Sequence, residues 1–73
     1  MIDKEHFNQV LQTILSIYER KKIRLKVEQV DHDNGIVVLK LIDNISCPKC
    51  VRTAIAAKLR YRFKHIRVVK IIK

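Results

Sequence analysis

The sequence predicts an α+β fold: a two-layer α/β sandwich with the element order α-β-β-α-β, in which two helices cover one face of a three-stranded mixed sheet. Apolar residues recur at helical spacing near the N-terminus and after residue 47, and at strand spacing in residues 23–42 and 65–73. With 73 residues, one glycine and one proline, the chain has room for a single domain, residues 1–73, and no linker. A chain of this length buries only about 60% of its unfolded surface, so we expect a small core.

The first helix is predicted from an apolar stripe with i, i+3, i+4 and i+7 spacing: Phe7, Val10, Leu11, Ile14 and then Ile17 or Tyr18. Asp3 is the expected N-cap, because its carboxylate can accept hydrogen bonds from the N–H groups of the first turn. The basic run of residues 20–22 suits the negative end of the helix dipole, so the helix is expected to end there.

Two strands are predicted to follow as an antiparallel hairpin. Residues 23–28 alternate between apolar and charged side chains, which is typical of a half-buried strand. Residues 36–42 are apolar apart from Lys40, so this strand is expected to be the more buried, central one. The turn cluster of residues 31–35 ends in Asn34 and Gly35, two residue types that tolerate a positive φ.

The second helix is predicted to begin after Cys47, because Pro48 fits the first helical position, where its missing N–H costs nothing. Its apolar stripe consists of Val51, Ile55 and Leu59. The last segment, residues 65–73, is rich in valine and isoleucine and is expected to be a strand. A right-handed crossover would make it parallel to the strand of residues 36–42. The pattern leaves open which strand it lies beside.

Charge is distributed unevenly along the chain. Residues 1–43 hold all seven acidic residues and seven of the sixteen basic ones, so the whole net charge of +9 falls in residues 44–73. Such a basic segment suits a polyanion, an acidic protein partner or a negatively charged cofactor, or it is simply a solvated surface rich in Lys and Arg.

The cysteine pair is expected to work in a reducing compartment. No apolar run approaches the roughly 20 residues that cross a bilayer, and the N-terminus lacks the apolar segment of a signal peptide. The chain is therefore expected to be cytoplasmic, without a membrane partner, and its thiols to stay reduced. Cys47 and Cys50 are then expected to be a metal or redox pair rather than a disulfide framework.

The spacing Cys47-Pro48-Lys49-Cys50 puts two thiols on the first turn of the predicted helix, where both sulfurs can face one metal ion. Free N–H groups and the helix dipole favour the thiolate form at this position. Lys49 and Arg52 are expected to add to that field and to offset the charge of a bound cluster.

The remaining ligands are not evident within one chain. The predicted topology puts His6, His32 and His65 at the end of the domain opposite the cysteines, as ordinary surface or turn residues, and leaves Asp43 as the only nearby carboxylate. A closed zinc site within one chain is therefore not expected. Two chains related by a two-fold axis would supply four thiolates, which suits a tetrahedral metal or a [4Fe–4S] or [2Fe–2S] cluster.

The sequence resembles the C-terminal domain of NifU, a family of iron–sulfur cluster scaffolds and carriers. The resemblance covers nearly the whole chain and is best in residues 25–41, followed by the Cys47–Cys50 motif and by Thr53 in the next helix. It implies that Cys47 and Cys50 bind the iron of a cluster bridged between two chains in a transient homodimer. It also implies that the cluster is delivered to apo-proteins, which the basic charge suggests are acidic.

Three other functions remain as alternatives. The order α-β-β-α-β also resembles part of a type II KH domain, and the basic segment would suit a nucleic acid, although the chain has no G-x-x-G loop. The motif Cys-Pro-Lys-Cys also resembles that of thiol–disulfide exchange proteins, and a zinc-binding protein is the third possibility. A conventional enzyme is not expected, because paired carboxylates, a nucleophile–histidine pair and a phosphate loop are all missing.

Overall fold

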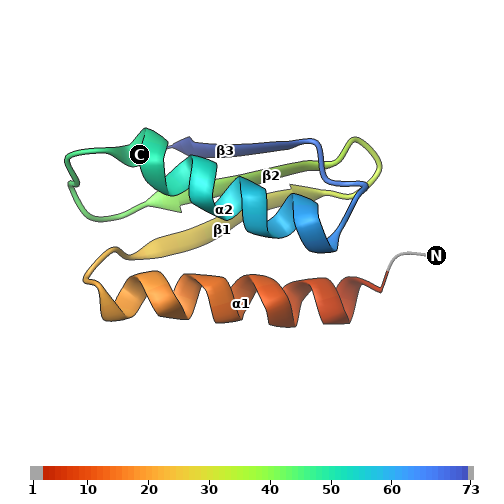
Figure 1. Ribbon diagram of the computed structural model, residues 1–73, viewed down its shortest axis with the longest axis horizontal. Helices are drawn as coiled ribbons and strands as arrows, with labels where there is room; N and C mark the ends of the chain where they lie inside the picture. The colour runs from red at the N-terminus through yellow and green to blue at the C-terminus, as the bar shows by residue number, and fades with distance from the viewer. Residues whose placement is uncertain (1–2, 73) are drawn as a thin grey trace.

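The computed structural model describes residues 3–72 of the chain and confirms the predicted order α-β-β-α-β (Figure 1). The elements are α1 (Lys4–Arg20), β1 (Leu25–Asp31), β2 (Ile36–Leu41), α2 (Pro48–Arg62) and β3 (Val68–Ile72). Lys73, the last residue of the predicted final strand, lies outside the described residues.

The three strands form one mixed sheet with the order β1-β2-β3. β1 and β2 are antiparallel, with Leu25 opposite Leu41, while β2 and β3 are parallel, with Ile36 opposite Val68. The central position of β2 and the parallel direction of β3 confirm the sequence predictions. The neighbour of β3, which the pattern left open, is β2.

Both ends of α1 are held by local hydrogen bonds. The Asp3 carboxylate accepts from the N–H of His6, so Asp3 is the N-cap that the sequence predicted. At the other end the N–H of Lys22 donates to the carbonyl of Glu19, and the N–H of Ile23 donates to the carbonyl of Tyr18. These two hydrogen bonds are the pair that defines a Schellman motif. Lys22 occupies the left-handed position of that motif, with a φ of 65°, which glycine usually takes.

The turn between β1 and β2 is tied to the connection that leads from α2 into β3. Gly35 has a φ of 68°, and its carbonyl oxygen accepts hydrogen bonds from the N–H groups of Arg67 and Val68. Within the turn the Asp31 carboxylate accepts from the N–H groups of Asp33 and Asn34. The start of β3 is thereby fixed against the hairpin turn.

Two strand boundaries differ from the sequence prediction. β1 begins at Leu25 rather than at Ile23, because the N–H of Arg24 donates to the Asp43 carboxylate instead of joining the ladder. β3 begins at Val68 rather than at residue 65, because the N–H of Ile66 bonds to the carbonyl of Phe63 in a turn. In both places a hydrogen bond outside the strand ladder takes a donor that a longer strand would have used.

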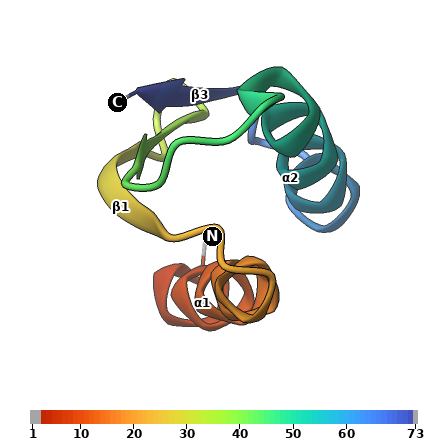
Figure 2. The same cartoon turned by 90° about the vertical axis from the view of Figure 1, so that its left-hand side faces the viewer.

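The core lies between one face of the sheet and the two helices (Figure 2). Its largest fully buried side chains come from both helices, from β2 and from the segment before β3: Phe7, Leu11, Val37, Leu39, Ile55, Leu59 and Ile66. The other face of the sheet is uncovered and carries the exposed lysines 26, 40 and 70. None of the helices in residues 3–72 has the length and apolar character that crossing a membrane requires.

Candidate metal or cluster site

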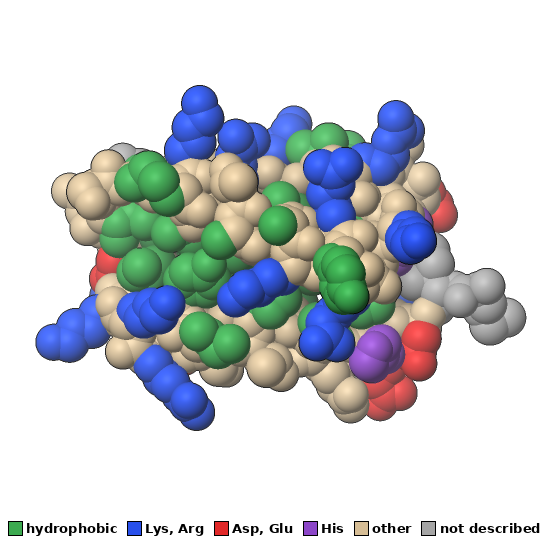
Figure 3. All heavy atoms as spheres, in the orientation of Figure 1, with side chains coloured by type: hydrophobic (Ala, Val, Ile, Leu, Met, Phe, Trp, Pro, Cys, Tyr) green, Lys and Arg blue, Asp and Glu red, His purple; other side chains and the backbone are tan. Residues whose placement is uncertain are grey.

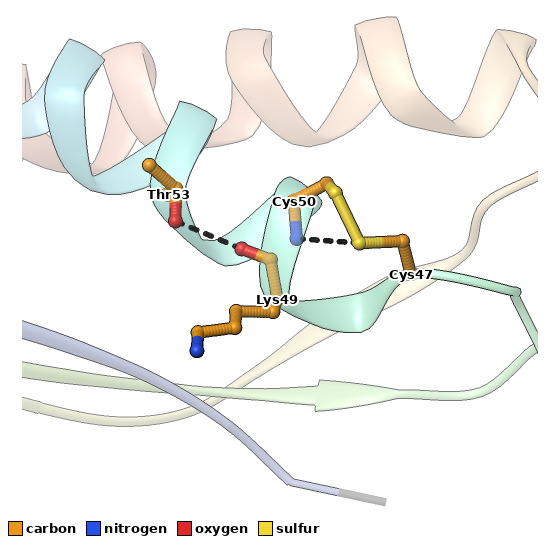
Figure 4. The surroundings of a disulfide bond; sticks show 4 residues. All are labelled: Cys47, Lys49, Cys50 and Thr53. Carbon is orange, nitrogen blue, oxygen red and sulfur yellow. Dashed lines mark hydrogen bonds between the residues drawn. A yellow bond between two sulfur atoms is a disulfide. The ribbon is translucent and has the colours of Figure 1, made fainter.

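The cysteine pair forms the first turn of α2. Cys47 is the N-cap of the helix, and its sulfur accepts a hydrogen bond from the N–H of Cys50 at 3.3 Å (Figure 4). The Cα atoms of the two cysteines are 5.4 Å apart and their sulfurs are joined in a disulfide. The spacing therefore brings both sulfurs to one point, as the sequence predicted, whereas the expected thiol state is replaced by a disulfide.

The helix begins here for reasons that are visible in the sequence. Pro48 takes the first helical position, and the buried side chain of Val51 anchors the first turn in the core. The hydroxyl of Thr53 donates to the carbonyl of Lys49 at 2.9 Å, which adds a side-chain bond to the same turn. Cys50 is exposed and Cys47 is half-buried, so solvent and a partner can reach this turn.

The predicted charges lie around this turn without touching the sulfurs. The side chain of Lys49 extends away from the disulfide in Figure 4, while the exposed Arg52 follows on the next turn. Residues 44–73 include no acidic residue, so no carboxylate of this segment opposes a negative charge at the sulfurs. The local field therefore comes from the helix N-terminus and from cations one turn away.

Asp43, the carboxylate nearest in sequence, is engaged elsewhere. Its oxygens accept from the Arg24 guanidinium at 2.9–3.2 Å and from the Arg24 backbone N–H at 2.8 Å. These hydrogen bonds hold the pKa of Asp43 below its ordinary value. Asp43 thereby links the segment that follows β2 to the residue that precedes β1. Sequence spacing did not reveal this structural role.

The three histidines lie near the opposite end of α2, as the predicted topology requires. His32 and His65 are half-buried, and Nδ1 of His32 is 3.1 Å from Nε2 of His65. Their rings surround the ring of Phe7, with centroid distances of 4.9 and 6.2 Å. Burial, followed by the nearby His65, lowers the pKa of His32. The expectation that both are ordinary surface or turn residues missed this pair, because 33 positions separate them in the sequence.

The described chain offers two sulfur ligands and no more at one place. In residues 3–72 no group of three or more His, Cys, Asp or Glu side chains is arranged to hold a metal ion. The turn can therefore contribute two of the four ligands that zinc or an iron–sulfur cluster takes.

No protein-family model, curated protein or solved structure matches the chain.

Proposed function

We propose that this protein is an iron–sulfur cluster scaffold or carrier, a non-enzymatic protein that binds a [2Fe–2S] or [4Fe–4S] cluster through Cys47 and Cys50. The observation that supports this function best is the two-sulfur turn at the start of α2, which has no further ligand beside it among residues 3–72. A cluster that takes four thiolates would obtain two from each of two chains.

Loading requires that a cellular thiol reductant first reduces the disulfide to two thiols by thiol–disulfide exchange and is itself oxidised to a disulfide. The thiolates then bind iron at the N-terminus of α2, where the N–H groups and the dipole stabilise negative charge. Two chains meet at this end of the domain and the cluster lies between them. Because Cys50 is exposed, the thiolates of an acceptor protein can replace the cysteines one at a time, in a ligand exchange that changes no oxidation state.

The charge of the chain suits this cargo and its recipients. A cluster bound by four thiolates is an anion, and the segment that holds the cysteines carries the whole net charge of +9. Acidic apo-proteins would be attracted by the same field. Zinc, bound by the same four sulfurs, is the alternative metal.

The test is anaerobic reconstitution of the reduced protein with iron and sulfide, followed by gel filtration with absorbance recorded for protein and cluster together. We expect a brown dimer with four cysteines per cluster. The Cys47→Ser and Cys50→Ser variants should each remain colourless, while Asp33→Asn, in the hairpin turn, serves as the control and should load as the parent does. A folded parent that stays a colourless monomer contradicts the proposal, and so does a cluster retained by either serine variant.

Thiol–disulfide exchange is the second candidate, and the bonded sulfurs favour it specifically. Equilibration with mixtures of reduced and oxidised glutathione distinguishes the two functions. An exchange protein should have a reduction potential near that of the glutathione pool. A potential far below this value would identify a disulfide that glutathione leaves intact, and would exclude exchange as the function.

A further inference from the structure

A cationic cleft runs between α2 and β3, on the side of α2 that faces the sheet edge. It is lined by Arg52, Ala56, Ala57, Arg60, Arg67 and Val68, and encloses about 400 Å³ at its Arg52 end. A second open hollow adjoins it, shares Arg60 and Arg67 with it, and is also lined by Tyr61 and Lys64 near the end of the helix. The strand β3 forms the free edge of the sheet along this cleft.

Four cations line the two walls of the cleft. Arg52 and Arg60 lie eight positions apart on one side of α2, a separation of about 12 Å along the helix. Lys64 and Arg67 belong to the connection between α2 and β3. All four side chains are exposed, and the one ion pair among residues 3–72 involves none of them. Figure 3 shows Lys and Arg side chains along the upper border, where β3 lies in Figure 1, and the visible acidic side chains near the two ends.

The floor of the cleft is made of small residues. Ala56 and Ala57 leave the surface of the helix open between the arginines, so that a chain of anionic groups can approach the helix backbone. Because the arginines are not paired with carboxylates, binding an anion here breaks no ion pair within the described chain. The planar guanidinium groups suit phosphate oxygens, which they can contact through two N–H groups.

Tyr61 adds a second, independent feature. Its side chain is 86% exposed although the ring is large, and it borders the cleft beside Arg60. A ring so exposed contributes almost nothing to the core, but it offers a flat face on which a nucleic-acid base can stack. A row of cations next to an exposed aromatic ring is the combination that single-stranded nucleic acids bind.

We propose that the cleft between α2 and β3 binds single-stranded nucleic acid, with its phosphates along Arg52, Arg60 and Arg67 and a base on Tyr61. The cleft includes neither sulfur, although Arg52 lies near both sites, and the proposal does not depend on the function proposed for the sulfurs. The four cations would neutralise up to four phosphates, so log K should fall with log salt concentration with a slope of about −3. Affinity should then weaken about 50-fold between 50 and 200 mM salt.

The test measures the fluorescence anisotropy of a labelled 12-residue oligouridylate titrated with the full chain over this salt range. The double variant Arg60→Gln/Arg67→Gln should lose at least about tenfold in affinity, and its slope of log K against log salt should become less negative by about 1.4. The control, Lys26→Gln/Lys40→Gln, makes the same change in net charge on the uncovered sheet face, where the two lysines lie opposite each other. It should change affinity by less than about threefold, and equal losses in the two double variants would overturn the proposal.

Three further arms test the stacking and the kind of ligand. Tyr61→Ala should weaken binding at least about fivefold, while Tyr61→Phe should bind as the parent does. Cys47→Ser should bind like the parent as well, so this result is independent of cluster loading. Absence of saturable binding at 50 mM salt, equal affinity for duplex DNA, or equally effective competition by polyglutamate would each overturn the assignment.

Discussion

The carbonyl oxygen of His65 lies so close to Gly35 that a β-carbon at this position would overlap it. This close approach brings the connection after α2 onto the hairpin turn, and the backbone N–H groups of Arg67 and Val68 bond to the carbonyl of the same glycine. Position 35 therefore combines a positive φ with contact against the backbone of another segment. Only glycine meets both conditions.

Substitution of Gly35 by alanine should be among the most damaging changes in this chain. The added carbon would overlap a backbone carbonyl and the left-handed φ would be strained, so we expect a loss of at least about 3 kcal/mol in the free energy of unfolding. Urea unfolding followed by circular dichroism measures this loss. Asp33→Ala in the same turn is the control, because the Asp31 carboxylate bonds to the backbone of residue 33 and not to its side chain. A Gly35→Ala protein as stable as the control would contradict this account of the turn.

Lys22 should give the opposite result. It takes the left-handed position at the end of α1, so Lys22→Gly should raise the free energy of unfolding by about 0.5–1 kcal/mol, or about 2–8 °C in the midpoint of thermal unfolding. Lys21→Gly is the matched control, since its φ of −90° gives glycine no advantage, and it should lower stability. Thermal unfolding of the two variants should show shifts of opposite sign, and a lower midpoint for Lys22→Gly would disprove the role assigned to φ.

His32 should make the free energy of unfolding fall as the solution becomes mildly acidic. Burial lowers the pKa of His32 in the folded protein, so below about pH 6.5 the unfolded chain binds the proton more readily than the folded one. Stability should therefore be intact above this pH and decline as the pH falls toward the lowered pKa of the folded state. The charge of Lys4 also lowers the pKa of His32, whereas the charges of Asp33 and Asp31 raise it.

Thermal unfolding at a series of pH values between 5 and 8 measures this decline. His32→Gln should flatten the dependence. Parallel curves for the parent and His32→Gln would show that His32 does not cause the effect.

The ion pair of Arg24 and Asp43 should contribute to the stability of the folded protein in a different, more acidic pH range. Hydrogen bonds from Arg24 lower the pKa of Asp43, so its contribution is present above the ordinary carboxyl pKa of about 4 and is lost as the pH falls through the lower folded value. Asp43→Asn should destabilise the protein at pH 7 and have little effect at pH 2. Chemical unfolding at both pH values tests this, with Asp33→Asn as the control, and a deficit that persists undiminished at pH 2 would contradict it.

The sequence predicted the element order because each element has its own local signal. The cap at Asp3, the start at Pro48 and the apolar periods depend on neighbours within a few positions, and the structure has all of them. The start of β1 was predicted less well, since the bond that fixes it joins groups far apart in the sequence. The N–H of Arg24 finds a carboxylate 19 positions away, which no local pattern indicates.

The site was predictable to a similar degree. The meeting of two sulfurs follows from their spacing at a helix start, and the position of the histidines follows from the topology. The contact between His32 and His65, and the cleft of Arg60 and Arg67, arise from packing of separate segments. Charge arithmetic located the basic segment in residues 44–73, but only the placement of α2 beside β3 converts it into a cleft.

The ring closed by the cysteines has a consequence for the lifetime of the protein. The two residues are only three positions apart, and a cross-link restricts the unfolded chain less as the loop that it closes becomes shorter. The core between the sheet and the helices includes neither sulfur. Opening or closing this disulfide therefore changes the folding equilibrium less than a bridge between distant positions would. The oxidised and reduced forms should therefore differ little in how often they unfold and become open to proteases.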